Sequence, residues 1–197
     1  MPVMTGTFIV LEGPDGAGTT THAKFLAERL QNEGKEVVLT AEPSKGPIGG
    51  WIRERLNDAT PLSPAALQML FCADRAEHLR SVIEPALAAG KTIICDRYIP
   101  STIAYGESVG LDIHWLKNLN TNFRQPDAVI LLLPPREICR ERLRKRAAHD
   151  LFEQEELQDK VYAAYQSLAK ADKTISVIDT SKDKQETARE IYEAAIH

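Results

Sequence analysis

A short apolar run that leads directly into a glycine-rich turn, and then into a helical pattern, constrains this chain most. Residues 7–12 (TFIVLE) predict a buried first strand, and residues 21–33 have apolar or small side chains at helical spacing. Between them lies GPDGAGTT, residues 13–20. Its glycines let the backbone turn tightly and aim its N–H groups inward, and the following helix N-terminus adds partial positive charge. This arrangement predicts an anion nest of the size that holds a nucleotide's phosphates.

The spacing of this turn matches the phosphate-loop (P-loop) pattern GxxxxGK[ST] except at one position, where Thr19 replaces the lysine. A P-loop lysine places positive charge on the β- and γ-phosphates, whereas threonine can only hydrogen-bond. Thr20 occupies the position of the hydroxyl that ligates Mg²⁺. A turn with a purely structural role is the alternative. The candidate nucleotide-binding residues here are Gly13, Asp15, Gly16, Ala17, Gly18, Thr19, Thr20 and Thr21.

Apolar runs alternate with helical patterns along the rest of the chain, which is typical of βαβ units. The runs are apolar throughout, as expected when helices cover both faces of a sheet. The sequence therefore predicts an α/β fold of the P-loop NTPase type, with about five parallel strands and helices on both faces. The further strands are expected at 36–40, 92–96, 128–133 and 174–179, and the further helices at 48–56, 65–78, 79–89, 136–146, 154–169 and 184–195.

Composition narrows the class of protein. A length of 197 residues fits one domain, residues 1–197, with a full core. The net charge of −4 makes a long nucleic-acid surface unexpected. Three cysteines without regular spacing predict free thiols and a reducing compartment, and no apolar run near the start is long enough for a membrane span. We therefore expect a cytoplasmic protein with no nucleic-acid or membrane partner.

A second group of polar residues ends the predicted third strand, where Asp96 is followed by Arg97. An acid at this position can hold Mg²⁺ together with Thr20, and the arginine can clamp a phosphate through two hydrogen bonds. Ligands of open parallel sheets bind at the carboxyl ends of the strands, so both groups should face one crevice. A surface salt bridge is the alternative reading of this pair.

These residues lie in segments that resemble the thymidylate kinase family. DRYIPSTIAY, residues 96–105, is similar to the family's DRY-x-x-S-x-x-AY segment, and LFCADRAEH, residues 70–78, is similar to its LF-x-ADRAEH helix. The stretch with Glu42-Pro43 and Pro47-Ile48-Gly49 resembles the family's EP…PIG stretch. The matches follow the family's order from about residue 8 to 180.

The resemblance implies roles for the matching positions. Phe71 stacks on the thymine ring, and Arg75 hydrogen-bonds the base. Arg97 grips the monophosphate of dTMP, Tyr105 lies against the deoxyribose, and Asp15 sits near the acceptor sugar and the metal. Ser101 belongs to the same segment and is a further candidate substrate contact. Taken alone, these side chains could equally be core or solvated surface residues.

An arginine-rich segment, residues 136–146, lies where the family has its mobile LID, expected here at about residues 142–153. In one family subtype the P-loop carries a catalytic arginine, and in another the LID supplies it. This P-loop has no arginine, so the resemblance makes Arg144 and Arg146 candidates for the catalytic charge, beside Asp15 and Arg97. Arg140 or Arg142 is expected near adenine. The LID is also the densest source of cations that could replace the P-loop lysine.

The resemblance as a whole implies ATP- and Mg²⁺-dependent phosphorylation of dTMP to dTDP, a step of nucleotide biosynthesis, by a homodimer. Two alternatives stay open. The chain could be a kinase for another nucleotide or nucleoside. It could instead bind nucleotide with little turnover, because Thr19 replaces the P-loop lysine.

Overall fold

The computed structural model describes residues 6–56, 62–145 and 152–196 of the 197-residue chain, and the side chains of residues 152–154 are not part of that description. A five-stranded parallel sheet in the order β2-β3-β1-β4-β5 forms its centre. The strands are β1 (Phe8–Glu12), β2 (Val37–Ala41), β3 (Thr92–Asp96), β4 (Ala128–Leu132) and β5 (Ile175–Ile178).

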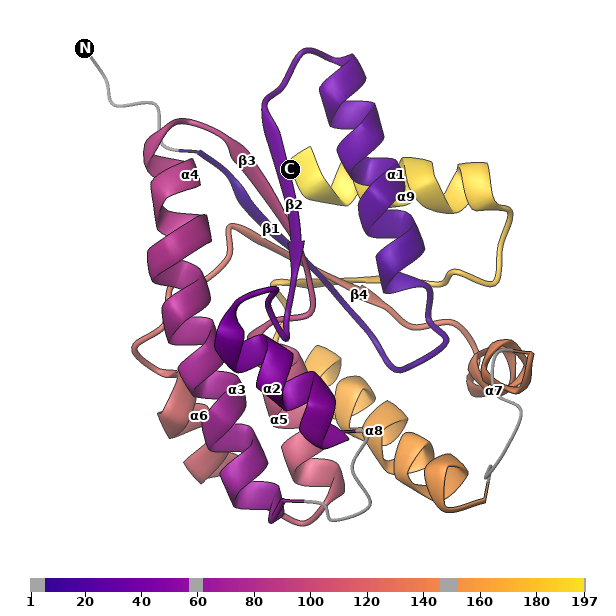
Figure 1. Cartoon of the computed structure of the whole chain (residues 1–197). Coiled ribbons are helices and arrows are strands. Elements are labelled where there is room, and N and C mark those ends of the chain that lie inside the picture. Colours follow the sequence, from indigo (N-terminus) through magenta and orange to yellow (C-terminus); the bar gives the residue numbers. More distant parts are fainter. Residues whose placement is uncertain (1–5, 57–61, 146–151, 197) are drawn as a thin grey trace.

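Helices connect these strands and lie on both sides of the sheet (Figure 1). In the part of the chain that the structure describes they are α1 (Thr19–Asn32), α2 (Pro47–Leu56), α3 (Pro64–His78), the π-helical turn η1 (Leu79–Ile83), α4 (Glu84–Ala88), α5 (Ile99–Ser108), α6 (Ile113–Asn120), α7 (Arg136–Arg144), α8 (Phe152–Ala171) and α9 (Lys184–Ile196).

Strand β1 is apolar from Phe8 to Leu11 because both of its faces are covered. Phe8 and Val10 point into the core beneath η1, α4, α5, α6 and α8. Ile9 and Leu11 point to the opposite core, under α1 and α9. Successive side chains of a strand alternate between the two faces of a sheet, so a strand covered on both sides needs an apolar residue at every position. Because β1 pairs with β3 in parallel, the carboxyl ends of these two strands lie side by side, and the P-loop begins there.

The predicted α/β architecture is confirmed, including the five parallel strands with helices on both faces. The predicted start of α3 is also confirmed, because Ser63 caps it by accepting a hydrogen bond from the Ala66 N–H at 3.4 Å. Of the expected LID, residues 146–151 lie outside the described residues. No helix in the described ranges is long and apolar enough to cross a bilayer.

Helices α5 and α6 were not predicted as helices. Helix α5 starts at Ile99 with Pro100 in its first turn, where the missing N–H has no helical partner to lose. Helix α6 starts at Ile113 and is capped by Asp112, whose carboxylate accepts from the Trp115 N–H at 2.7 Å.

The predicted helix at 79–89 differs in its first turn, since η1 widens the helix shortly before Pro85. A proline ring clashes with the carbonyl four residues earlier in a regular α-helix, and a π-turn avoids that clash.

Gly106 allows α5 and α6 to pack closely. A Cβ atom at Gly106 would lie 2.5 Å from Cδ2 of Leu116, which is itself fully buried and cannot swing into solvent. We expect Gly106→Ala to destabilise the fold by about 1–3 kcal/mol through overpacking. Gly50→Ala is the matched control, because Gly50 is also helical but has its nearest neighbour at 4.0 Å. That variant should gain up to about 1 kcal/mol from helix propensity. Urea unfolding measures both, and equal effects of the same sign would contradict the packing argument.

Candidate active site

The P-loop follows β1 and has the backbone geometry that the glycines predict. Gly16 and Gly18 have φ angles of 85° and 96°, which L side chains rarely adopt. A Cβ atom at Gly16 would also lie 2.6 Å from the carbonyl oxygen of Cys139 in α7. Gly13 is similarly close to β4, since its Cβ would lie 2.6 Å from the Leu132 carbonyl oxygen. The loop therefore packs closely against α7 and β4.

Arg142 supports this loop from its carbonyl side. Its Nη1 donates to the Gly16 carbonyl oxygen at 3.1 Å, and its Nη2 donates to the Thr180 carbonyl oxygen at 2.7 Å. The Thr180 hydroxyl in turn donates to the carbonyl oxygen of Ala17 at 2.7 Å. The structure thus places Arg142 between the P-loop and the segment after β5. Within the loop, the Ala17 N–H donates a hydrogen bond to the Pro14 carbonyl oxygen at 3.0 Å.

Thr20 and Asp96 meet at the start of α1. The Thr20 hydroxyl donates to Oδ2 of Asp96 at 2.5 Å, while Oδ1 of Asp96 is buried without a hydrogen-bond partner among the described residues. A hydroxyl and a carboxylate oxygen are hard donors of the kind Mg²⁺ prefers, and Mg²⁺ commonly takes its remaining ligands from water and substrate phosphates. The described residues contain no group of three or more His, Cys, Asp or Glu side chains that could hold a metal ion. The donors present fit a P-loop magnesium site.

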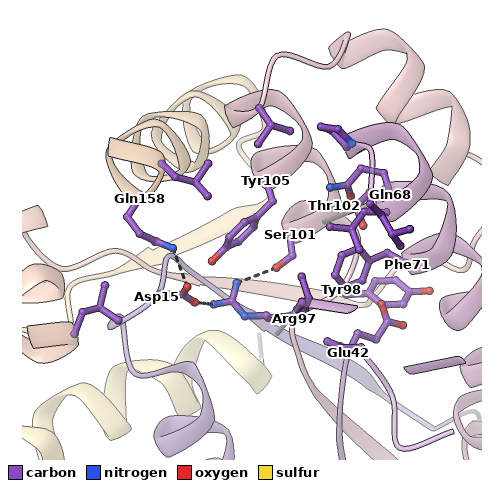
Figure 2. A pocket seen from close by; sticks show the side chains of 18 of the residues that line it. Asp15, Glu42, Gln68, Phe71, Arg97, Tyr98, Ser101, Thr102, Tyr105 and Gln158 are labelled. Carbon is purple, nitrogen blue, oxygen red and sulfur yellow. Dashed lines mark hydrogen bonds and ion pairs between the residues drawn. The ribbon is translucent and has the colours of Figure 1, made fainter. Parts of the chain in front are cut away.

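Arg97 extends from the end of β3 toward the P-loop (Figure 2). Its φ angle is 72°, an uncommon left-handed conformation for a residue with a side chain. Its Nη2 pairs with Oδ1 of Asp15 at 2.5 Å, and its Nη1 donates to the Ser101 hydroxyl at 3.3 Å. The guanidinium carbon lies 5.3 Å from the centre of the Tyr105 ring. Burial raises the pKa of Tyr105 to about 12, so its phenol stays neutral.

Gln158 completes this cluster from α8, beyond the expected LID. Its Nε2 donates to Oδ2 of Asp15 at 2.8 Å, so Asp15 lies between Gln158 and Arg97, as Figure 2 shows. The sequence reasoning missed Gln158, because a single glutamine in an amphipathic helix carries no motif. The structure brings together the predicted residues Asp15, Arg97, Ser101 and Tyr105.

A second polar network surrounds Arg75 on α3. Arg75 is only 1% exposed, and its Nε donates to Oε2 of Glu42 at 2.9 Å. Its other nitrogens donate to the Asn120 side-chain oxygen and, at 3.0 Å, to the Thr102 hydroxyl. Glu42 also contacts Nδ1 of His78 at 3.2 Å. Phe71 is on the same helix, and both Phe71 and Arg75 line the adjoining cavity.

Two cavities meet at Asp15 and Arg97. The larger has a volume of about 640 Å³ and extends over Phe71 and Arg75 to α7 and α8. The smaller, about 220 Å³, follows the P-loop. Asp15, Arg97 and Leu143 line both cavities. The other described residues that line the smaller one are Pro14, Gly16, Gly18, Thr19, Thr20 and Thr21.

The arginines of α7 point in two directions. Arg136, Arg140 and Arg144 are spaced four apart, share one helix face and line the larger cavity. Arg136 and Arg140 pair with the two oxygens of Asp159 at 2.5 and 2.6 Å, and Arg144 pairs with Glu155 at 2.9 Å. The structure therefore separates Arg140 from Arg142, which faces the P-loop carbonyls. Arg146 lies outside the described residues.

Glu12, which the sequence reasoning also missed, is the buried centre of this region. It is the last residue of β1 and has no exposed surface. Its Oε1 accepts from the Tyr98 N–H at 2.7 Å and the Ser101 N–H at 3.3 Å. Its Oε2 accepts from the hydroxyls of Ser101 at 2.7 Å and Tyr165 at 2.8 Å. Burial raises the pKa of this carboxyl, and its hydrogen bonds and the charge of Arg97 oppose the rise.

We expect Glu12→Gln to lower the free energy of unfolding by about 1–3 kcal/mol, because an amide NH₂ would face donors that then lack an acceptor. Tyr165→Phe is the control, since it removes one of the four donors and should cost about 0.5–1.5 kcal/mol. Urea unfolding at neutral pH measures both variants. A Glu12→Gln protein as stable as the wild type would show that the carboxylate does not hold these segments together.

Comparison of the sequence with known proteins shows the family of this chain. The family model described as thymidylate kinase matches residues 11–191. A probable thymidylate kinase of Pyrococcus horikoshii is 46% identical over 173 residues, which are 84% of each chain. A probable thymidylate kinase of Thermococcus kodakarensis is 42% identical over 193 residues, 93% of this chain and 94% of the other. A thymidylate kinase of a Synechococcus strain is 43% identical over 171 residues, 84% of this chain and 82% of the other. The chain therefore belongs to the thymidylate kinase family.

Proposed function

We propose that this protein transfers the γ-phosphoryl group of ATP to dTMP and so forms dTDP and ADP. The observation that carries the proposal is the pair of cavities that meet at Asp15 and Arg97. One follows a P-loop, as a donor nucleotide requires, and the other has an aromatic ring and a buried arginine at its far end, as a pyrimidine base requires. The family and the names of the relatives support this assignment.

In the reaction, an oxygen of the dTMP phosphate attacks the γ-phosphorus of ATP, and the bond from that phosphorus to the β–γ bridging oxygen breaks. The attacking phosphate is already anionic, so the step requires no general base and depends on positioning and charge neutralisation. The P-loop N–H groups would hold the donor phosphates, and Arg97 would hold the acceptor phosphate. Thr20 and Asp96 would hold Mg²⁺, which supplies charge neutralisation for the phosphates.

The acceptor nucleoside would lie in the larger cavity. Phe71 would stack on thymine, Arg75 would hydrogen-bond it, and Tyr105 would lie against the deoxyribose. The buried ion pair with Glu42 fixes the Arg75 guanidinium, and Glu42 is itself oriented by His78. Pre-organised donors of this kind reject a base that lacks the matching acceptor.

Of the described LID arginines, we propose Arg144 for the charge that develops in transfer. It lines the larger cavity and pairs with Glu155, so it must leave that carboxylate to reach a phosphate. Arg146 is the second candidate, and a LID at about residues 142–153 would bring both over the donor phosphates. Arg140 or Arg142 would lie near adenine, and the contact of Arg142 with Thr180 beside the P-loop supports Arg142 for this role.

We also propose a cytoplasmic homodimer. The exposed apolar side chains of Trp51 on α2 and Met69 on α3 offer surface for a second copy. Cys72, Cys95 and Cys139 are buried free thiols, and burial raises the pKa of each, which suits a reducing compartment.

A panel of acceptors tests the proposed reaction. ADP formation is measured with dTMP, dUMP, dCMP, dAMP, dGMP and thymidine at equal concentrations. We expect dTMP to give the highest kcat/KM. A different preferred acceptor would assign the chain to another nucleotide or nucleoside. Tight nucleotide binding without turnover on any acceptor would instead identify a binding protein, the alternative that Thr19 favours.

We expect Asp96→Asn to raise the Mg²⁺ concentration for half-maximal activity by about tenfold or more, because it removes charge beside Thr20. Its affinity for dTMP, measured by calorimetry, should change much less. Asp172→Asn is the matched control, since that carboxylate bonds only to nearby Thr174 in the described structure. An unchanged magnesium dependence in Asp96→Asn would remove Asp96 from the metal site.

A further inference from the structure

Gln68 is a polar residue in the wall of the larger cavity that has no role in the proposed reaction. It lies on α3, is only 3% exposed and lines the cavity. Phe71 and Arg75 follow it at three and seven residues, so the three side chains share one face of the helix. Figure 2 shows Gln68 near Phe71 and Thr102, at the end of the cavity away from Asp15. This is the end proposed for the base.

The side-chain oxygen of Gln68 distinguishes it from the other polar residues at this end. Its Oε1 is buried and has no hydrogen-bond partner among the described residues. Glu42 and Thr102 line the same cavity but are engaged by Arg75, which donates to them at 2.9 and 3.0 Å. A buried amide oxygen without a donor destabilises a protein, so native structures rarely leave one without a reason. A hydrogen-bond donor on a bound ligand is such a reason.

Arg75 limits which base atoms can lie beside this glutamine. A guanidinium only donates, so the base atom that faces Arg75 must be an acceptor, such as a carbonyl oxygen. In thymine and uracil the ring nitrogen between the two carbonyls carries a hydrogen, and that N3–H needs an acceptor. An amide oxygen is such an acceptor, and the terminal torsion of glutamine is broad enough for Oε1 to turn toward the cavity. In cytosine the ring nitrogen beside the carbonyl has no hydrogen, so a donor and an acceptor in this order do not match it.

We propose that Gln68 is a specificity-determining residue that accepts the N3–H of thymine, beside the carbonyl oxygen that Arg75 binds. The two side chains together recognise a carbonyl and an adjacent N–H, which thymine and uracil present and cytosine does not. The N3–H also satisfies the buried oxygen, so affinity and selectivity come from the same atom. This inference rests on the proposed function and adds a residue that discriminates among the pyrimidine bases.

Gln68→Met tests the proposal, because methionine is similar in size but only a weak acceptor. Calorimetry measures the affinities of the wild type and the variant for dTMP, dUMP and dCMP. We expect the variant to bind dTMP and dUMP about three- to tenfold more weakly, as the loss of one hydrogen bond predicts, and dCMP with less than about a twofold change. Without nucleotide, the urea concentration at the midpoint of unfolding should stay equal or rise, because the variant removes an unpartnered buried amide.

Gln31→Met is the matched control, because Gln31 is an exposed glutamine on α1 that lines neither of the two cavities, and it should change none of these affinities. An unchanged affinity of Gln68→Met for dTMP would overturn the proposal. Equal losses for dTMP and dCMP would overturn it too, and a lower unfolding midpoint would then assign Gln68 to packing. A wild-type protein that binds dTMP without phosphorylating any acceptor would contradict the proposed function, and the affinity comparison would still decide the role of Gln68.

Discussion

The buried carboxylate of Glu12 is the interaction on which the site depends. It ends β1 immediately before the P-loop and accepts hydrogen bonds from Tyr98 in the turn after β3, from Ser101 of α5 and from Tyr165 of α8. Three segments far apart in the sequence are thus held by one side chain with no access to water. A buried charged acceptor is stable only when its hydrogen bonds are made, so the carboxylate requires these segments to be in place together. The positions of Arg97 and Ser101 follow from that requirement.

Several arginines of the site pair with carboxylates. Arg97 pairs with Asp15, Arg75 with Glu42, and Arg144 with Glu155, while Asp159 pairs with both Arg136 and Arg140. These arginines therefore have carboxylate partners before any phosphate arrives. A phosphate that binds to Arg97 or Arg144 must compete with a carboxylate, whereas Arg75 is buried in an ion pair that holds it still. The difference suits their proposed roles, since phosphate contacts change during transfer and the base contact does not.

Much of this could be predicted from the sequence. The strands were recognisable because both faces of the sheet are buried, and the P-loop because its glycines have conformational demands that few other residues meet. The ordered motifs located Phe71, Arg75, Arg97 and Tyr105, and the structure brings Asp15, Arg97, Ser101 and Tyr105 into one cluster. All of these signals are local in the chain.

The parts that could not be predicted depend on tertiary contacts. Glu12 and Gln158 gain their positions from partners about 90 and 140 residues away, and no local pattern distinguishes them from ordinary polar residues. The contacts of each α7 arginine could also not be predicted from the sequence. Helical spacing shows which side chains share a face of the helix, but it does not show which other element that face packs against. That is why Arg140 and Arg142 were grouped together, although one lies against Asp159 and the other against the P-loop.

The central claim is that the two cavities form one continuous site for two nucleotides that meet at Arg97. The most direct measurement is the affinity of a bisubstrate analogue in which adenosine and thymidine are joined through five phosphates. If the cavities are continuous, linking the two ligands raises the local concentration of the second, and the analogue should bind at least about a hundredfold more tightly than ATP or dTMP alone. An analogue that binds no more tightly than the better of the two separate nucleotides would contradict the account.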